Sequence, residues 1–363
     1  MPNFVVKRLE RLGKSCLNSI LLAGRKPLPP AAVVPERLRR IGVFRLDQRI
    51  GNGILLLPLL QAIRHGCPQA ELHVLVHAPV AELFQEAARD LNLTIWPYRQ
   101  ARLLRKPWRL VGLLRAWRGL QLDVLLSASN PDHFSLSQGL WARWCRARCG
   151  VGFRRGAADR VYHRTVETPP DLPYALALVR LWQDIQPEAA PQPAYLKVPE
   201  QRVEAIRSRY PQLTGGVCLW LGATGRKPLP GWLVEKLYQA LPRIFGLPLR
   251  VMAGPADQKV VGSLPTPLRQ RVHLWEEPLT ETAALFSTFQ LFVSGDTGPR
   301  HLAVALRVPT VGIFHHSNMH QYGTAGDQRH RTIQLTGNRL RDWRQVEAEL
   351  KRMGAIVAHP AGS

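Results

Sequence analysis

The segment 291–305, LFVSGDTGPRHLAVA, most constrains what this chain can fold into. Its apolar start predicts a buried strand that ends at Gly295, and Pro299 suits the first position of a following helix. The unpaired N–H groups and the positive dipole end of such a helix form an anion site. In open α/β sheets ligands bind at this carboxyl edge, where His301 in the first helical turn can reach a phosphate. An ordinary strand–turn–helix connection is the simpler alternative.

A longer stretch, GDTGPRHLAVALRVPTVGIF, resembles the (S/N)D(S/T)GPxHLAxALxxPxVxLF signature of glycosyltransferase family 9. This family comprises the heptosyltransferases of bacterial lipopolysaccharide assembly. The resemblance implies a GT-B fold, an α/β architecture in which two doubly wound Rossmann-like domains face a central cleft. It also implies that the loop holds the nucleotide-diphosphate end of a sugar donor, through Asp296, Thr297, Gly298 and His301.

Composition limits the class of protein. The 363 residues suffice for two domains, and a net charge of +23 indicates a polyanionic neighbour. Candidates are an anionic membrane, a phosphorylated substrate and nucleic acid, but no nucleic-acid-binding motif supports a specific nucleic-acid partner. Five scattered cysteines predict free thiols in a reducing compartment. No cofactor and no metal site are expected, because neither the Cys145–Cys149 pair nor the histidines His315, His316 and His320 have a complementary ligand set.

The first 38 residues form a separate predicted unit. Apolar residues recur at helical spacing over residues 1–24, and Lys and Arg occupy much of the remaining surface. Such a basic amphipathic helix suits the cytoplasmic face of the inner membrane, where each nearby Lys or Arg contributes about 1 kcal/mol. A helix packed on the protein's own surface is the alternative. The Pro-rich stretch 25–38 predicts a linker.

Strands alternating with helices predict two parallel sheets. The first domain is expected over 39–190, with strands at 39–46, 71–76 and 122–126 and, after a glycine loop, a helix over 54–64. A Pro- and Ala-rich stretch at 187–199 indicates the boundary. The second domain is expected over 191–345, with strands at 217–221, 249–253, 271–274, 291–294 and 310–314. A helix over 339–353 follows, and residues 346–363 hold its end and a tail.

The segment 44–60, FRLDQRIGNGILLLPLL, resembles the family's opening RLxxxGDxxxxxPxLxxL. Gly51 and Gly53 permit close approach of an acceptor to the backbone. The family has its general base directly after the first glycine, where this chain has Asn52. An amide cannot accept a proton at useful pH. Asn52 therefore orients the acceptor while another group acts as base, or the acceptor differs, or the protein binds without turnover.

Asp47 is the first candidate for the missing base, because it lies at the end of the same predicted strand. Its alternative role is to cap a turn. Asp132 and His133 follow the strand at 122–126, so they are expected on the acceptor side and serve as reserve candidates. All three would meet the donor at one sheet edge.

Two further loops indicate a donor site on the second domain. The stretch 219–232, LWLGATGRKPLPGW, resembles the family's phosphate loop, with Lys227 at the position of its lysine. A lysine stabilises a departing diphosphate, and Thr224 can donate to the same phosphate. The stretch 251–257, VMAGPAD, resembles the family's strand ending in G-x-x-(D/E), which makes Asp257 the candidate to accept from ribose hydroxyls. A solvated Lys227 in a turn and an exposed loop Asp257 are the structural alternatives.

The sequence thus predicts an inverting glycosyltransferase. Its expected partners are a nucleotide sugar such as ADP-heptose, an anionic glycolipid acceptor of the lipopolysaccharide core type, and the anionic membrane surface. The competing interpretation, based on Asn52, is a non-catalytic, membrane-associated protein of the same fold that binds sugar nucleotides or acts as a scaffold.

Overall fold

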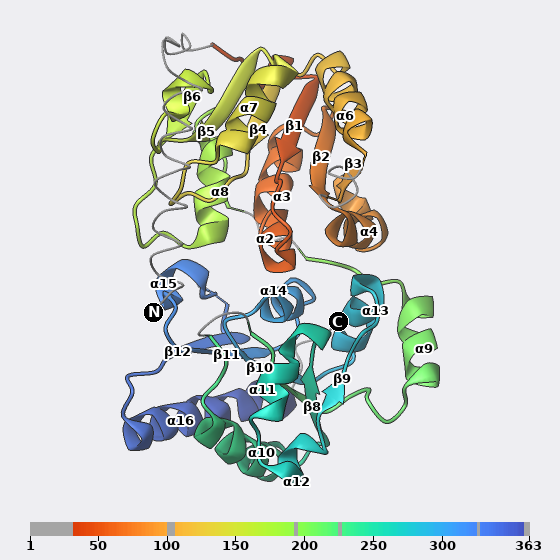
Figure 1. Cartoon of the computed structure of the whole chain (residues 1–363), viewed down its shortest axis with the longest axis vertical. Helices are drawn as coiled ribbons and strands as arrows, with labels where there is room; N and C mark the ends of the chain where they lie inside the picture. Colours follow the sequence, from red (N-terminus) through yellow and green to blue (C-terminus); the bar gives the residue numbers. More distant parts are fainter. Residues whose placement is uncertain (1–31, 100–105, 192–194, 224–226, 325–326, 359–363) are drawn as a thin grey trace.

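The computed structural model describes residues 32–99, 106–191, 195–223, 227–324 and 327–358. These residues form two parallel six-stranded sheets, each with helices packed against it, and the two sheets lie at opposite ends of an elongated molecule (Figure 1). The predicted α/β class with two doubly wound domains is confirmed. The helix predicted over residues 1–24 lies outside the described residues.

The first sheet contains β1 (Arg40–Phe44), β2 (Glu71–His77), β3 (Leu93–Tyr98), β4 (Val124–Ser127), β5 (Cys149–Phe153) and β6 (Arg164–Val166). The helices of this half are α2 (Ile50–Ile54), α3 (Leu57–Gly66), α4 (Ala78–Ala87), α6 (Pro107–Gly119), α7 (Leu136–Cys145) and α8 (Tyr174–Gln183). Short 3-10 turns, η1 (Pro35–Arg37), η2 (Arg89–Leu91) and η3 (Ala158–Arg160), complete it.

The second sheet contains β7 (Val217–Trp220), β8 (Leu249–Ala253), β9 (His273–Leu274), β10 (Leu291–Gly295), β11 (Thr310–Phe314) and β12 (His330–Gln334). The helices of this half are α9 (Glu200–Arg209), α10 (Gly231–Phe245), α11 (Gln258–Gly262), α12 (Thr266–Arg269), α13 (Leu279–Phe286), α14 (Gly298–Ala305), α15 (Met319–Tyr322) and α16 (Arg339–Ala358). A 3-10 turn, η4 (Pro255–Asp257), follows β8.

Both sheets have the same topology. The first has the order β3-β2-β1-β4-β5-β6, and the second has β9-β8-β7-β10-β11-β12 when read in the same sense. In each sheet the strand order reverses between the first and fourth strands, where Ile41 pairs with Val124 and Leu291 with Val217. Ligands of such sheets bind beyond the carboxyl ends of these strands. The loops after β1, β4, β7 and β10 are therefore the expected site.

The glycine segment after β1 is helical, which corrects the predicted loop followed by one helix over 54–64. Residues Ile50–Ile54 form α2, and α3 begins separately at Leu57. Pro58 suits the first turn of α3, where its missing N–H has no helical partner. Gly53 permits the close packing of α2 against α4, because a Cβ at this position would lie 2.8 Å from Cγ2 of Val80 on α4.

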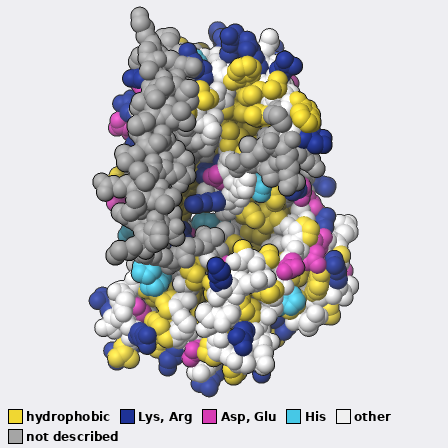
Figure 2. All heavy atoms as spheres, viewed as in Figure 1, with side chains coloured by type: hydrophobic (Ala, Val, Ile, Leu, Met, Phe, Trp, Pro, Cys, Tyr) yellow, Lys and Arg dark blue, Asp and Glu magenta, His cyan; other side chains and the backbone are white. Residues whose placement is uncertain are grey.

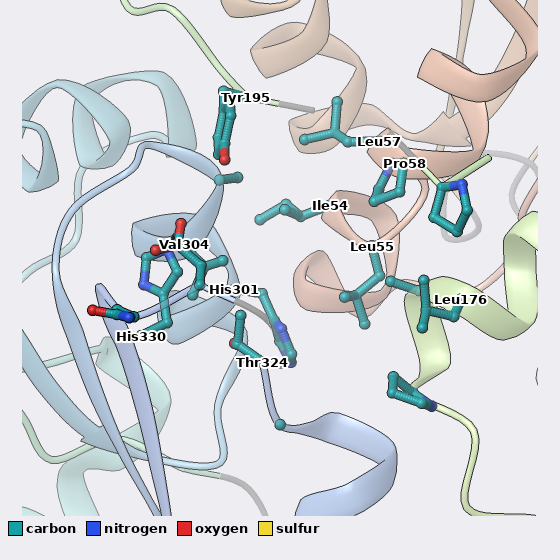
Figure 3. Close-up of a pocket in the computed structure, with 17 residues that line it drawn as sticks. Ile54, Leu55, Leu57, Pro58, Leu176, Tyr195, His301, Val304, Thr324 and His330 are labelled. Carbon is teal, nitrogen blue, oxygen red and sulfur yellow. Dashed lines mark ion pairs between the residues drawn. The ribbon is translucent and has the colours of Figure 1, made fainter. Parts of the chain in front are cut away.

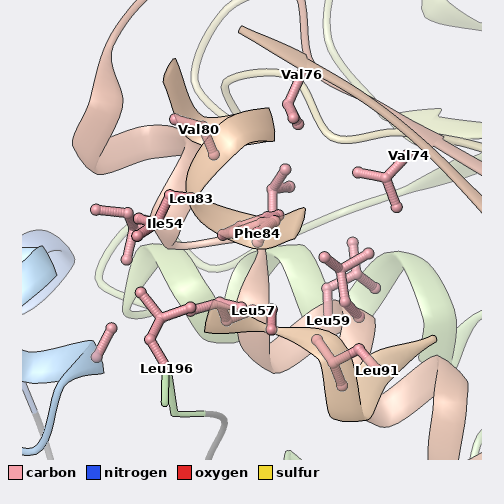
Figure 4. Packing of buried hydrophobic residues seen from close by; sticks show 14 of the residues in the cluster. Ile54, Leu57, Leu59, Val74, Val76, Val80, Leu83, Phe84, Leu91 and Leu196 are labelled. Atoms are coloured by element: carbon pink, nitrogen blue, oxygen red, sulfur yellow. The ribbon is translucent and has the colours of Figure 1, made fainter. Parts of the chain in front are cut away.

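One apolar cluster connects the two domains. It begins between α2, α3 and α4, where Leu57, Leu83 and Phe84 pack together (Figure 4), and continues into α13 and α14 of the second domain. The connecting segment takes part in both halves, since the N–H of Leu196 donates to the carbonyl of Ala305 over 2.8 Å. The domains therefore share a continuous buried contact.

His330, at the start of β12, predicts a pH-dependent stability. It is buried, its Nδ1 lies 3.0 Å from Oγ1 of Thr310, and burial lowers its pKa to about 4 despite the nearby Asp327. Below about pH 6.5, His330 is therefore protonated in the unfolded chain, while it stays neutral in the folded chain until the pH falls to about 4. This residue should lower the free energy of unfolding by about 2 kcal/mol between pH 7 and pH 5.

Urea unfolding at the two pH values tests this prediction in wild type and His330→Gln. The variant should lose less stability on acidification, because it has no imidazole to protonate. An identical loss in both proteins would contradict it.

Candidate functional site

The loop after β1 holds Asp47 in a fixed position. Arg45 is 1% exposed, and its Nε donates to Oδ2 of Asp47 over 2.8 Å. The amide Nδ2 of Asn52 donates to the same oxygen over 3.1 Å, and the N–H of Arg49 donates to Oδ1 over 3.1 Å. The turn-capping contact is therefore present. The carboxylate still remains partly exposed at the carboxyl edge of the sheet, with a side-chain exposure of 32%.

The loops after β7 and β10 meet in one ion pair. The Lys227 ammonium binds Oδ2 of Asp296, whose side chain is only 4% exposed, and Lys227 Nζ lies 5.1 Å from the ring centroid of Tyr322. The two predicted donor loops thus converge. A carboxylate has the same sign of charge as a phosphate, so Asp296 would act on an anionic ligand only through Lys227. We describe Asp296 as a positioning residue for that ammonium.

Helix α14 begins beside this pair, and its surroundings are positive. Thr297 is the N-cap and its side chain makes no capping hydrogen bond, so the first-turn N–H groups receive no cap from it. Behind them lies the fully buried Arg300, which donates to the Tyr322 carbonyl and, over 3.0 Å, to Oγ1 of Thr324. Burial lowers the pKa of Arg300 to about 10, so it stays charged at neutral pH.

Gly51 and Gly298 mark the contact between the two halves of the site. A Cβ on Gly51 would lie 2.9 Å from the Cα of Gly298 and 3.0 Å from Cδ2 of His301. Both values are below ordinary contact distance, so side chains at Gly51 would separate α2 from α14. These glycines bring the β1 loop and the anion site together, as Figure 1 shows for α2 directly above α14.

His301 lies between the anion site and a cavity of about 650 Å³. Burial lowers the pKa of His301 well below its usual range, and Arg300 and Lys227 lower it further. The neutral imidazole can donate to or accept from a ligand. The cavity opens between the domains beside Ile54, Leu55 and Leu176 (Figure 3). Lys227 and Asp296 do not line it, so this space adjoins the anion site and does not contain it.

Two contacts between the domains involve α15 and were not predicted. The rings of Tyr174 and Tyr322 stack with centroids 5.7 Å apart, and the Arg45 guanidinium lies 5.2 Å from the Tyr174 centroid. In addition, Nε2 of Gln321 donates to Oδ2 of Asp132 over 2.7 Å. The Tyr322 ring therefore lies between the Asp47 loop and Lys227. No sequence pattern indicates this bridge, because its members come from distant elements.

The other predicted residues have varied positions. Thr224 lies outside the described residues. Asp257 accepts from the N–H of Gly254 over 3.0 Å, and the N–H of Ala223 also donates to it. Its contact with a ribose stays a prediction. His133 is exposed. In the described part of the chain, no three His, Cys, Asp or Glu side chains are grouped as metal ligands would be.

Two doubly wound domains, each with a parallel six-stranded sheet, are the architecture of the GT-B class of fold. Residues 243–351 match the model of glycosyltransferase family 9 (heptosyltransferase). This match confirms the family resemblance carried by the motif at 295–314, and it supports glycosyltransferase activity. The motifs at 44–60 and 219–232 lie outside the matched residues. No curated protein matches the chain in sequence.

Solved structures of heptosyltransferases share the fold. A family 9 glycosyl transferase from Veillonella parvula has a TM-score of 0.68 at 16% identity, over 87% of this chain and 91% of its own. The ADP-heptose lps heptosyltransferase II of E. coli has a TM-score of 0.66 at 16% identity, over 90% and 100%. The E. coli heptosyltransferase WaaC with ADP has a TM-score of 0.61 at 17% identity, over 85% and 99%.

Proposed function

We propose that the protein is an inverting glycosyltransferase that moves a sugar, heptose in the first instance, from a nucleotide-diphosphate donor to a lipopolysaccharide core or related glycolipid. The observation that carries this proposal is the ammonium of Lys227, paired with Asp296 beside the start of α14 and facing the β1 loop. The ADP and ADP-heptose named for the E. coli neighbours support an ADP-linked donor.

The reaction breaks the bond between the anomeric carbon and the diphosphate oxygen while an acceptor hydroxyl oxygen attacks that carbon from the opposite face. Negative charge grows on the departing diphosphate. We assign its stabilisation to Lys227, the N–H groups of α14 and the buried charge of Arg300, which lie around the start of α14. No metal ion is needed for this part of the proposal, because three protein groups supply the positive potential.

The acceptor hydroxyl must lose its proton, and we assign that proton to Asp47. Its carboxylate lies on the opposite side of the junction from the anion site, at the carboxyl end of β1. Asn52 then has a different task from a base: its amide holds Oδ2 of Asp47 at 3.1 Å. The acceptor itself, the absence of a cofactor and a location at the cytoplasmic face of the inner membrane remain parts of the proposal.

Asn52→Asp follows from this geometry as a separate prediction. Two carboxylates would then lie about as close as the present 3.1 Å contact, so they would repel each other and share a proton. We expect turnover to survive but to require higher pH than in wild type, measured as a kcat–pH profile. If wild type is inactive with every donor and Asn52→Asp creates activity, the non-catalytic interpretation is correct.

Turnover with ADP-heptose and truncated lipopolysaccharide acceptors tests the proposed function. We expect ADP release that depends on the acceptor and a product enlarged by one sugar in mass spectrometry. A donor panel that includes UDP- and GDP-sugars distinguishes a wrong sugar from a wrong activity. Binding of nucleotides without transfer to any acceptor would favour the alternative, a non-catalytic sugar-nucleotide-binding protein.

A further inference from the structure

The first domain has an exposed surface on α6 and α7 that the proposed reaction does not use. In the part of the chain that the structure describes, seven large hydrophobic side chains are exposed, and five of them belong to these two helices. They are Trp108, Leu110, Val111, Leu140 and Trp144. We call this set, together with the exposed Arg109, Arg115 and Arg118 on α6, the α6–α7 surface.

Helix α6 is apolar on two faces, which is unusual for a helix at a protein surface. Its inner face supplies Trp117, which is fully buried and packs edge-on against Trp96 and Trp141 with centroids 6.1 Å apart in both pairs. Its outer face exposes 65% of Trp108, although that residue has no role in this core. The core therefore explains one apolar face of α6 and leaves the other without a partner.

The charge around these side chains is of one sign. Neither α6 nor α7 contains an acidic residue, and Arg109, Arg115 and Arg118 are exposed on α6. The Arg118 guanidinium on α6 lies 5.9 Å from the ring centroid of Trp144 on α7. A cation and an indole ring are therefore neighbours between the two helices. Figure 2 shows basic and hydrophobic side chains side by side over the upper end of the molecule, where Figure 1 has α6 and α7.

Two adjoining hollows extend the positive charge. Their volumes are about 640 and 540 Å³, and both are lined by Arg118 and Arg146. The lining of the two includes six arginines, Arg39, Arg40, Arg118, Arg143, Arg146 and Arg148. The lining has one acidic residue, Asp123, which already pairs with Arg148 at 3.3 Å. Most of this positive charge has no acidic partner among the described residues.

We propose that the α6–α7 surface docks the protein on an anionic lipid membrane. Indole rings and aliphatic side chains enter the boundary between headgroups and acyl chains, while guanidinium groups beside them bind lipid phosphates. Nucleic acid would match the arginines but would leave Leu110, Val111 and Leu140 without an apolar environment. The inference rests on the membrane location in the proposed function and deepens it, because it assigns that contact to one surface away from the donor and base residues.

Co-sedimentation with vesicles tests the proposal on the full chain. Wild type should bind vesicles of equal parts phosphatidylglycerol and phosphatidylcholine, with binding that falls as salt rises. Arg109→Glu/Arg115→Glu and Trp108→Ala/Trp144→Ala should each weaken binding, the charge variant by roughly tenfold or more. The matched control is Leu340→Ala/Arg341→Glu on α16, which changes an exposed apolar residue and an arginine elsewhere and should bind as wild type does.

Unchanged vesicle binding in both α6–α7 variants would overturn the proposal, as would equal binding of wild type to pure phosphatidylcholine vesicles. Tighter binding of duplex or single-stranded nucleic acid that the same variants abolish would assign the surface to nucleic acid instead. Thermal unfolding shows that the variants are folded. ADP titration tests the donor site independently of membrane binding. The α6–α7 variants should bind ADP as wild type does, whether or not they bind vesicles.

Discussion

Asp47→Asn is expected to lower kcat by about a hundredfold or more, because loss of a general base typically costs that much. The amide keeps the size of the side chain and can still accept from Arg45, but it cannot take the acceptor's proton. Donor binding should change little, since Asp47 belongs to the other side of the junction from Lys227. Steady-state kinetics with saturating donor measures the effect.

The structural role of Asp47 needs its own control. Asp47 is the carboxylate partner of the buried Arg45, so Asp47→Asn also weakens an ion pair and should lower the melting temperature. Rates are therefore compared per folded molecule. Full kcat in a destabilised Asp47→Asn would make Asp47 a turn cap and partner of Arg45 only. A loss confined to Asp132→Asn would transfer the role of base to Asp132, which contacts Gln321.

Lys227→Ala is expected to lower kcat on the order of a hundredfold to a thousandfold, the usual cost of removing one group that stabilises charge developing in the transition state. Thr297 and the α14 N–H groups would remain, so residual turnover is expected. The variant leaves the buried Asp296 carboxylate without its cation, which affects stability as well. The double variant Lys227→Ala/Asp296→Asn removes that unpaired charge and should recover stability without recovering rate.

Asp296→Asn separates positioning from direct binding. If Asp296 only holds Lys227, its amide variant should lower kcat less than Lys227→Ala does, and adding it to Lys227→Ala should cost nothing further. Equal losses in the two single variants would show that the position of the ammonium matters as much as its charge. A larger loss in Asp296→Asn than in Lys227→Ala would contradict the positioning role.

Strands that are apolar along their length were predictable, and several strands that contain proline, glycine or polar residues were not. Runs such as 291–294 and 310–314 are buried on both faces and read as strands directly. No strand was predicted at β3, which contains Pro97, or at β12, whose HRTIQ pattern is polar. Nor was one predicted at β5, which carries Gly150 and Gly152. Such residues weaken strand propensity, and pairing within the sheet overrides it.

The donor half of the site was more predictable than the acceptor half. Lys227 and Asp296 belong to short motifs with characteristic spacing, and the structure brings them together. By contrast, the contacts of Arg45, Tyr174 and Tyr322 join three elements far apart in the chain. Only the packing of the two domains creates them. The same holds for Asn52. The sequence shows that it replaces the family's general base, but its contact with Asp47 depends on the helical conformation of α2.

Calorimetric titration with ADP and AMP tests the central claim most directly, that α14 and Lys227 form a diphosphate site. Wild type should bind ADP more tightly than AMP, because the second phosphate reaches the positive groups of the site. Lys227→Ala and His301→Ala should each weaken ADP binding and reduce the difference between the nucleotides, while thermal unfolding shows both folded. Unchanged ADP affinity in both variants, or no preference of wild type for ADP over AMP, would contradict the account.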